Sequence, residues 1–425
     1  MNIIFQTLGC KVNQYETETM REALCNLGHT SDKNNTVDAV VINSCTVTAE
    51  SDRKTRQLVR RMRREYPNAV IALTGCMVQA FPDDAKNLTD ADIIVGNRDV
   101  SKVIDAINKY DNNRYFKVEK HEKNDMYNTI GLSSFNERTR AFMKIQDGCD
   151  RFCTYCIIPF ARGRVRSRSV EDIKAEAARL ANNGFCEIVL VGINLTSYGK
   201  GENFDICDAI DAVCEVDGIK RVRLGSLEPD HITDQMLGRF KSQPKFCPQF
   251  HLSLQSGCDE TLKRMNRHYD TAFYEDLVNR IRLTFDNAAI TTDIMVGFAG
   301  ETQEEFQKSI EFARKIKFAQ AHIFAYSRRS GTIAYGLKNQ VSNAEKKSRA
   351  KLMAETTLKT QNEFLKSQIG NIYPVLFETQ ENNTAEGYTA NYTRVIIKTD
   401  KILTGTIQNV LIESVDKDYC IGKIL

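Results

Sequence analysis

Three cysteines lie close together in the middle of the chain, in the segment Gln146-Asp-Gly-Cys149-Asp-Arg-Phe-Cys153-Thr-Tyr-Cys156. Their C-x3-C-x2-C spacing supplies three thiolates from one loop. A [4Fe–4S] cluster has four irons, so three thiolates leave one iron open to another ligand. A zinc site is the alternative, but zinc favours two C-x2-4-C pairs or paired histidines, and neither stands near this loop. The spacing therefore predicts an iron–sulfur cluster with one open iron.

An open iron can chelate the amino and carboxylate groups of S-adenosylmethionine (SAM). An electron passed through such a cluster then splits SAM to a 5′-deoxyadenosyl radical. The sequence shows no histidine or carboxylate pair with clear catalytic spacing. The cysteine spacing therefore favours radical chemistry, for which we expect no catalytic residues beyond the cluster ligands.

A second set of cysteines is spread through the first hundred residues. Cys10, Cys45 and Cys76 each end a short apolar, β-rich run, and helical patterns at 16–27 and 49–65 separate these runs. Alternating strands and helices predict a parallel sheet, whose strands all end at the edge where ligands bind. The three thiols can therefore converge, although 35 and 31 residues separate them in sequence.

The number of cysteines also points to metal ligation. Thirteen is many for a protein without a secretory signal, and the first residues, 1–6, have no basic region of that kind. No apolar run is long enough to span a bilayer, so we expect a cytoplasmic protein with no membrane partner. We expect most of the remaining cysteines to be buried core residues. These are Cys25, Cys186, Cys207, Cys214, Cys247, Cys258 and Cys420.

A chain of 425 residues should form two or three domains. Residues 1–110 form the predicted α/β unit, and the polar residues 111–137 indicate a linker. Residues 138–368 contain six strand–helix units and then a long charged helix at 342–368. They predict a partial (β/α)6 TIM-like barrel with its chemistry at the strand ends. The short β-type runs of 369–425 predict a small five-stranded all-β barrel.

At this point the chain resembles the radical SAM methylthiotransferase family over essentially its whole length. The resemblance implies an N-terminal methylthiotransferase domain, a radical SAM barrel and a C-terminal TRAM domain. Besides the C-x3-C-x2-C loop, it rests on motifs in the same order: Thr7-Leu-Gly-Cys-Lys-Val-Asn13, Asn43-Ser-Cys45, Thr74-Gly-Cys76, Cys156-Ile-Ile-Pro-Phe-Ala-Arg-Gly-Arg164, Leu254-Gln-Ser-Gly257, Thr292-Asp-Ile-Met-Val-Gly-Phe298 and Tyr326-Ser-Arg-Arg-Ser-Gly-Thr332.

The resemblance also implies a reaction. Cys10, Cys45 and Cys76 would hold an auxiliary [4Fe–4S] cluster, whose open iron carries the sulfur to be transferred. One SAM would methylate that sulfur, and a second would yield the radical that removes hydrogen from the substrate carbon. A flavodoxin- or ferredoxin-type donor would supply the electron. SAM contacts are implied at strand ends: Tyr155, Gly192, Asn194, Ser226, Glu228, Gln255 and Gly297.

The substrate is indicated by the residues around the cysteines. Segments 11–16, 43–48 and 145–153 look most like the subgroup that acts on N6-threonylcarbamoyladenosine beside the anticodon, at position 37 of tRNA. Its product is the 2-methylthio derivative. The sister subgroups act on isopentenyladenosine in tRNA or on an aspartate of a ribosomal protein. Three residues depart from the common pattern without removing a ligand, namely Phe160, Ser44 and Ala299.

Basic residues gather in two stretches, although the net charge is only +3. Residues 53–64 hold seven Lys/Arg and no acid, and residues 138–168 hold eight Lys/Arg and two Asp. Such stretches can meet phosphates, and a solvated helix face is the alternative for 53–64. Residues 371–425 hold five Lys/Arg and seven Asp/Glu, so RNA binding there is implied only by the TRAM resemblance. The candidate RNA contacts are Arg162, Arg164, Arg166, Arg168, Tyr388, Tyr392 and Arg394.

Two alternative functions are also compatible with the cysteine pattern. A non-enzymatic RNA-binding protein with structural zinc would be colourless and poor in iron. A radical SAM enzyme whose second cluster only relays electrons would take its sulfur from elsewhere. We expect a tRNA methylthiotransferase that is a monomer.

Overall fold

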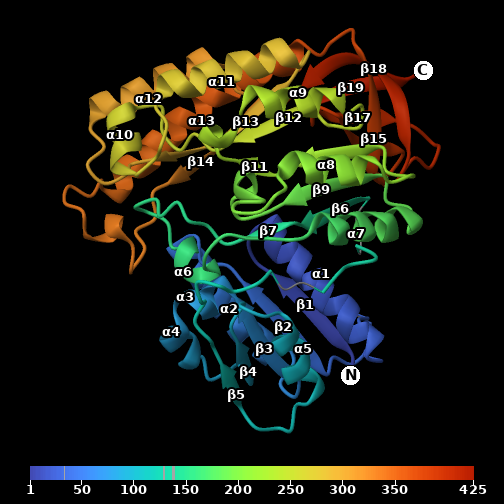
Figure 1. Cartoon of the computed structure of the whole chain (residues 1–425), viewed down its shortest axis with the longest axis vertical. Helices are drawn as coiled ribbons and strands as arrows, with labels where there is room; N and C mark the ends of the chain where they lie inside the picture. The colour runs from blue at the N-terminus through green and yellow to red at the C-terminus, as the bar shows by residue number, and fades with distance from the viewer. Residues whose placement is uncertain (33, 128–129, 136–138) are drawn as a thin grey trace.

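The computed structural model describes residues 1–32, 34–127, 130–135 and 139–425 (Figure 1). The N-terminal unit is a parallel sheet of order β1-β2-β3-β4-β5. Its strands are β1 (Ile3–Thr7), β2 (Ala39–Ser44), β3 (Val70–Gly75), β4 (Ile93–Val95) and β5 (Tyr115–Lys117).

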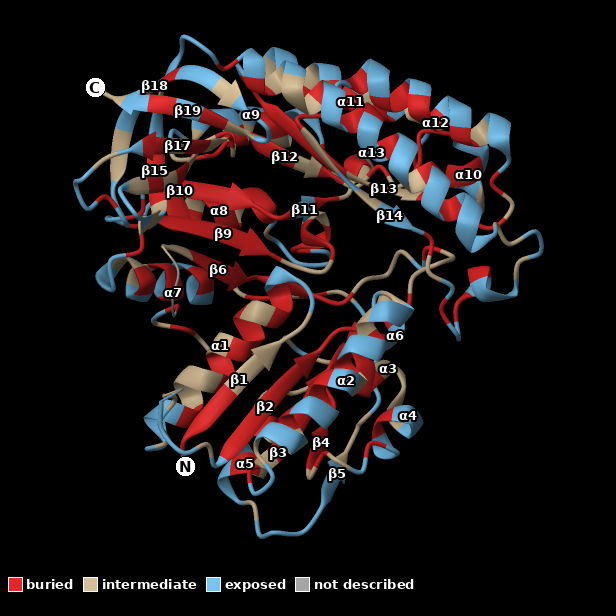
Figure 2. Cartoon of the chain, turned by 180° about the vertical axis from the view of Figure 1, so that it is seen from behind, coloured by how far each residue is buried: buried red, intermediate tan, exposed pale blue. Residues whose placement is uncertain are grey.

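Helices cover both faces of this sheet. On one face lie α1 (Lys11–Asn26) and α5 (Ser101–Asn108), and on the other lie α2 (Ala49–Glu65), α3 (Cys76–Ala80) and α4 (Pro82–Lys86) (Figures 1 and 2). The central strands are therefore buried on both sides, which explains their near-continuous apolar sequences.

Strand β5 lies within the range predicted as a linker, and this prediction is corrected there. The strand has only three residues, pairs only with β4 at the sheet edge, and leaves Tyr115 and Phe116 exposed. A strand of this kind has no apolar alternation to reveal it. The predicted linker end at 137 lies outside the described residues.

The central unit is the predicted partial barrel. Two parallel sheets, β10-β9-β6 and β11-β12-β13-β14, carry six main strands that match the six predicted ones. Its helices lie outside them, and Ser169 caps α7 by accepting a hydrogen bond from the backbone of Asp172 at 3.2 Å. The main strands are β6 (Arg140–Lys144), β9 (Glu187–Val191), β10 (Arg221–Leu224), β12 (Gln249–Leu252), β13 (Ala289–Val296) and β14 (Gln320–Ala325), with the short β7 (Gln146–Asp147), β8 (Arg166–Ser167) and β11 (Ser226–Leu227). The helices are α6 (Ile158–Arg162), α7 (Val170–Asn182), α8 (Ile206–Cys214), α9 (Asp234–Ser242), α10 (Asp259–Arg264), α11 (Thr271–Thr284) and α12 (Gln303–Ile316).

After helix α13 (Asn343–Lys366) the chain forms a closed barrel of order β15-β16-β17-β19-β18. This small barrel has its own apolar core and docks on the strand starts of the central unit. There Arg221 donates to the carbonyl oxygen of Tyr388 at 2.9 Å, and Arg140 pairs with Glu378 at 2.6 Å. The strands are β15 (Ile372–Glu381), β16 (Thr384–Thr389), β17 (Arg394–Lys398), β18 (Ile407–Asp416) and β19 (Tyr419–Ile424).

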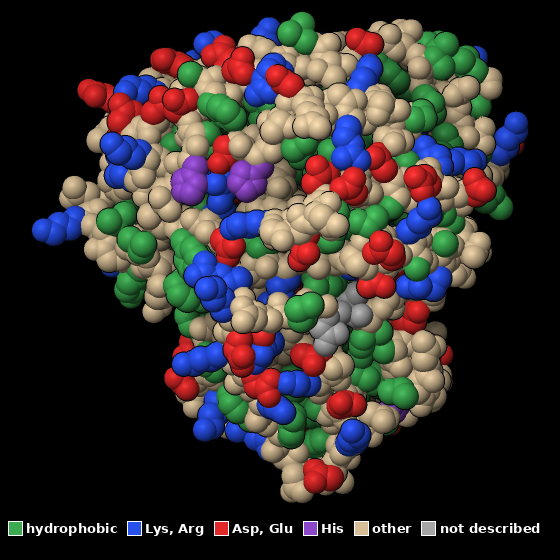
Figure 3. All heavy atoms as spheres, viewed as in Figure 1, with side chains coloured by type: hydrophobic (Ala, Val, Ile, Leu, Met, Phe, Trp, Pro, Cys, Tyr) green, Lys and Arg blue, Asp and Glu red, His purple; other side chains and the backbone are tan. Residues whose placement is uncertain are grey.

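Two predictions from the sequence concern the molecule as a whole, namely the burial of most other cysteines and the lack of a membrane-spanning helix. Of the seven cysteines predicted as core residues, Cys207, Cys214, Cys247, Cys258 and Cys420 are buried. Acidic and basic side chains intermingle on the face shown in Figure 3. Across the described part of the chain, no helix combines the length and the apolar character that a membrane crossing requires.

Candidate active site

The three separated cysteines lie at one edge of the N-terminal sheet. Cys45 and Cys76 directly follow β2 and β3, Cys10 lies three residues beyond the end of β1, and these three strands are neighbours in the sheet. Burial raises the pKa of the Cys76 thiol to about 12; the Arg162 guanidinium opposes this rise, and the Cys45 and Cys10 thiols add to it. The fold therefore brings these three sulfurs together.

Two glycines show how tightly the cysteine turns are built. Gly75 precedes Cys76 with a φ of 101°, and a Cβ on it would overlap the backbone of Ser44. Gly148 precedes Cys149 with a φ of 74°, and a Cβ there would overlap the carbonyl of Arg164. Only glycine adopts these conformations without strain, so each turn places the sulfur through its backbone.

The second group of cysteines lies in the loop between β7 and α6. Burial raises the pKa of the Cys156 thiol, and the nearby Cys153 and Cys149 thiols raise it further. Side chains from other elements donate to these sulfurs: Asn194 to Cys149 at 3.8 Å and Arg267 to Cys153 at 3.3 Å. Donors of this kind are what ligating thiolates require, so the residues present fit a cluster in this loop.

Hydrogen-bond donors also reach the cysteines at the edge of the N-terminal sheet. Cys76 accepts hydrogen bonds from Arg162 at 3.1 Å and from Asn97 at 3.7 Å. Within the described ranges, no three His, Cys, Asp or Glu side chains are arranged to hold a single metal ion. A cubane cluster binds its thiolates through separate irons, so converging thiols need not have the geometry of a single-ion site.

A buried ion network beside Cys76 joins the N-terminal unit to the central barrel. Arg162 is fully buried and pairs with Glu16 of α1 while it donates to Cys76. Lys144 lies 2.7 Å from both Glu16 and Asp147. Because burial of an unpaired charge is costly, these residues hold the N-terminal sheet and the barrel in one relative position.

The structure corrects the prediction that the alternating arginines face RNA phosphates. Arg162, Arg166 and Arg168 are buried, and Arg168 pairs with Glu176 at 2.8 Å. Of the four, Arg164 is exposed. Their carboxylate partners lie far away in sequence or on another element, so the local pattern gives no sign of this burial.

The tyrosines predicted to contact RNA face the central barrel instead. The rings of Tyr388 and Tyr392 stack with centroids 4.7 Å apart, and the Arg140 guanidinium lies 5.1 and 5.0 Å from them. Arg394 pairs with Glu386 at 2.7 Å on the outside of the small barrel. The two rings therefore form part of the contact between the barrels.

A cavity of about 510 Å³ runs through the central barrel. It reaches from Cys10 at the strand ends to Tyr392 of the small barrel at the strand starts. A second cavity of about 220 Å³ contains Tyr155 and Cys156 and shares Asp293 with the first. The two cavities therefore adjoin, and each touches one group of cysteines.

Four of the seven predicted SAM contacts line these cavities. Tyr155 and Gln255 lie in the smaller cavity, and Gly192 and Ser226 lie in the larger one. All four stand at or just after strand ends or in the cysteine loop, as the fold class leads one to expect.

The other three predicted SAM contacts have protein partners. Asn194 donates to a cysteine of the loop, and Glu228 forms an ion pair with Arg267. Gly297 lines neither cavity, and the space that its Cβ would need is occupied by Lys346. In this structure its role is to let α13 approach β13.

A row of polar side chains inside the larger cavity was not identified from the sequence. Gln249 and His251 both contact the hydroxyl of Thr291 at 3.0 Å, and His251 lies 3.5 Å from Asp293. The ring of His322 lies 6.0 Å from that of His251. Polar residues within apolar strands are a weak sign of such a row, because they do not show which face of the strand points into the barrel.

Known families and proteins resemble the chain along its length. It matches the "Radical SAM superfamily" over residues 143–313 and the "Uncharacterized protein family UPF0004" over residues 2–96. Among solved structures, the radical SAM methyltransferase TsrM from Kitasatospora setae has a TM-score of 0.57 and 13% identity, covering 91% of this chain and 81% of its own. That likeness concerns the fold alone.

Three curated relatives are much closer in sequence. A Bacillus subtilis (strain 168) protein described as threonylcarbamoyladenosine tRNA methylthiotransferase MtaB is 36% identical, over 100% of this chain and 96% of its own. A Thermotoga maritima protein of the same description is 38% identical over 88% and 86%. A Finegoldia magna protein described as tRNA-2-methylthio-N(6)-dimethylallyladenosine synthase is 33% identical over 95% and 90%. The chain therefore belongs to the radical SAM methylthiotransferase family and, within it, to the MtaB-type subgroup.

Proposed function

We propose that this enzyme converts N6-threonylcarbamoyladenosine beside the anticodon of tRNA to its 2-methylthio derivative. The observation that carries the proposal is the polar lining of the larger cavity. The relatives described as threonylcarbamoyladenosine enzymes support it, because two of them are 36% and 38% identical to this chain.

The cavity suits a polar, anionic adenosine substituent. A threonylcarbamoyl group carries a carboxylate, a hydroxyl and amide groups, whereas an isopentenyl group carries none of these. Lys11, His251 and His322 line the cavity together with Gln249 and Gln320. An isopentenyl group offers these side chains no hydrogen bond, and displacing water from a buried polar group without replacing its hydrogen bond costs about 1–3 kcal/mol.

The ionisable side chains of this wall lie close enough to affect one another's charge. Burial lowers the pKa of His322, and the neighbouring His251 and Lys11 lower it further, whereas Asp293 opposes this effect. A bound carboxylate would act as Asp293 does and favour the charged imidazolium. We therefore assign recognition of the threonyl carboxylate to the part of the cavity around Lys11 and His322.

We propose that the six converging cysteines hold the two [4Fe–4S] clusters of the family. When bound, the clusters and SAM supply a methylated sulfur and a 5′-deoxyadenosyl radical. Arg267 and Asn194 orient the loop cysteines by donating to their sulfurs, and Arg162 does so at Cys76. The cavity walls keep water away from the substrate carbon.

A competition assay tests the substrate. The reconstituted enzyme is given tRNA bearing either modification at equal concentration, and the 2-methylthio products are counted by mass spectrometry. We expect the threonylcarbamoyl substrate to be preferred in the wild type and the preference to fall at least about tenfold in His322→Leu. His29→Leu is the matched control, because His29 contacts Met1 and Asn108 and lines neither cavity. A preference for isopentenyladenosine in the wild type would refute the proposal.

An iron count tests the cluster assignment separately. The anaerobically reconstituted wild type should contain about eight irons, and a variant with alanine at Cys149, Cys153 and Cys156 about four. About four irons in the wild type and none in the variant would show that the sheet-edge cysteines hold no cluster.

A further inference from the structure

We infer that the outward face of α2 and the adjoining edge of β1 form a second docking surface for the substrate RNA, one that binds its phosphodiester backbone. This inference rests on tRNA being the substrate. The surface comprises Lys54, Arg60, Arg61, Arg63 and Arg64 of α2 with Gln6 and Leu8 beside them, and it borders a hollow of about 810 Å³.

The positive charge of this face is only partly balanced by carboxylates of the protein. Residues 53–64 carry seven Lys/Arg and no acid. Arg63 pairs with Asp92 at 2.5 Å, and Arg61 lies 3.7 Å from Glu65. For Lys54, Arg60 and Arg64, no carboxylate among the described residues lies within ion-pair distance.

The basic residues of α2 differ in exposure from the arginines of the central barrel. Of the barrel arginines that were predicted to meet RNA, Arg162, Arg166 and Arg168 are buried. The α2 residues Lys54, Arg60 and Arg64 are exposed. The apolar face of the same helix packs on the sheet through Leu58, Val59 and Met62. Lys54, Arg60 and Arg64 therefore take no part in this packing, and the concentration of basic residues on the helix creates a strong local potential.

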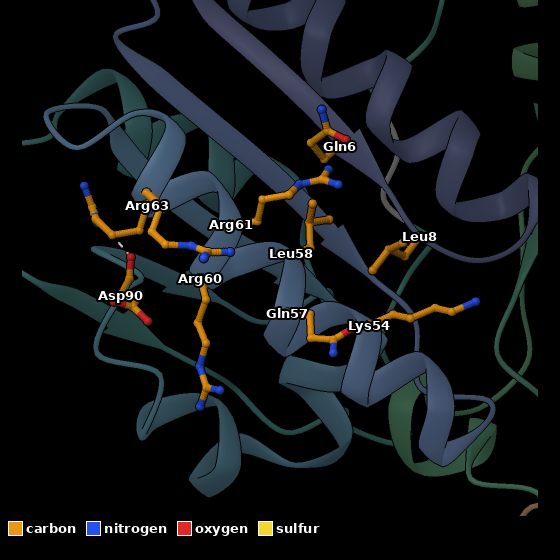
Figure 4. Close-up of a pocket in the computed structure, with 10 residues that line it drawn as sticks. Gln6, Leu8, Lys54, Gln57, Leu58, Arg60, Arg61, Arg63 and Asp90 are labelled. Atoms are coloured by element: carbon orange, nitrogen blue, oxygen red, sulfur yellow. Dashed lines mark hydrogen bonds between the residues drawn. The ribbon is translucent and has the colours of Figure 1, made fainter.

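The sheet leaves room beside the helix. Figure 2 shows α2 in front of the sheet with its outward surface exposed, next to β1 and β2. In Figure 4, Arg61 and Lys54 extend toward Gln6 and Leu8 of the β1 edge, while Arg60 extends in the opposite direction. A strand of RNA lying along this face would meet cations on both sides of the helix.

One border of this surface lies next to the large cavity in which the reaction is proposed to occur. Leu8 lies on its border, and the next two residues, Gly9 and Cys10, line the large cavity. From Lys54 to Arg64 the helix rises about 15 Å, which is long enough to accompany several consecutive phosphates. An adenosine inserted into the cavity would therefore leave its flanking backbone directed along α2.

Binding to tRNA at several salt concentrations tests the inference. We compare the reconstituted wild type with the triple variant Lys54→Gln/Arg60→Gln/Arg64→Gln. The matched control, Lys351→Gln/Lys359→Gln/Lys366→Gln, removes the same charge from exposed positions of α13. Each lost phosphate contact lowers the slope of log K against log salt by about 0.7–0.9, so the α2 variant should lose about 2–3 slope units.

We expect the α2 variant to bind tRNA roughly 10- to 100-fold more weakly near 0.1 M salt, while the control binds like the wild type. Iron content and the circular dichroism spectrum should match the wild type in both variants, because all the replaced residues are exposed. An unchanged slope in the α2 variant, or an equal loss in the control, would overturn the inference. If the wild type binds tRNA but yields no methylthiolated product, the proposed function fails instead.

Discussion

Replacing Arg162 by methionine separates two roles that the structure gives this side chain. It is fully buried, pairs with Glu16 and donates to the sulfur of Cys76 at 3.1 Å. Methionine keeps much of the length and removes the charge and all donors. We expect both the stability of the fold and the properties of the proposed auxiliary cluster to change.

The stability loss follows from the partners left behind. Removing one partner of a buried ion pair costs about 3–5 kcal/mol. Glu16 keeps Lys144 at 2.7 Å, and Asp147 keeps both Lys144 and Arg166. Because neither carboxylate is left without a cation, we expect a loss near the lower end of that range, about 3 kcal/mol.

The effect on the cluster has a different origin. A cation donating to a ligating sulfur favours the reduced state, which carries one more negative charge. If reduction strengthens this charged hydrogen bond by about 1.4 kcal/mol, its loss lowers a one-electron potential by ~59 mV. We therefore expect the auxiliary cluster to become harder to reduce by about this amount.

Arg168→Met is the matched control. Arg168 is also buried and pairs with Glu176 at 2.8 Å, but it contacts no cysteine. The assays are the urea midpoint of unfolding and a redox titration followed by electron paramagnetic resonance. Both variants should lose stability, and only Arg162→Met should shift the potential. An equal shift in both variants, or none in either, would refute the reasoning.

Two further predictions follow from the turns and the buried carboxylates. Gly75→Ala should destabilise the N-terminal unit by more than about 1 kcal/mol and reduce its iron content, because the new Cβ overlaps the backbone of Ser44. Gly184→Ala has a similar φ of 87° but open space around it, so it should cost only about 1 kcal/mol and leave the iron content unchanged. As for pH, burial opposes the charge of Asp147, but Lys144, Arg162 and Arg166 hold its pKa well below the usual range. Its contribution to stability is present above the unfolded-state pKa of about 3.9 and is lost as pH falls toward the folded-state pKa. The urea midpoint should therefore drop between about pH 5 and pH 3 in the wild type, and less in Asp147→Asn; equal drops would contradict this assignment.

Much of the fold was predictable because its strands are long and apolar. The strands that end in Cys10, Cys45 and Cys76 stand out by composition, and their shared position in βα units predicts that the thiols meet at one edge. Helix α1 begins at Lys11 rather than near residue 16, because Cys10 is extended and ends the preceding turn. The periodicity of apolar residues in the sequence does not reveal that first helical turn.

The parts of the site that escaped prediction depend on contacts distant in sequence. Arg162 and Arg168 look like surface cations because their partners, Glu16 and Glu176, are brought to them only by the fold. His251 and His322 lie on parallel strands whose two faces are both covered, so alternation alone does not show which face points into the barrel. Their role becomes visible only when the strands enclose a cavity.

The contact of the small C-terminal barrel with the central unit has a mechanical consequence. Arg223 donates to the carbonyl oxygen of Ala390 at 2.8 Å, and Tyr392 forms one end of the large cavity. The small barrel thus forms part of the wall of this chamber, and direct contacts hold it there. Deleting it would open the chamber to solvent and leave Arg223 and Glu187 facing water. Groups carried by the small barrel are therefore fixed relative to the cavity, because direct contacts join the two barrels.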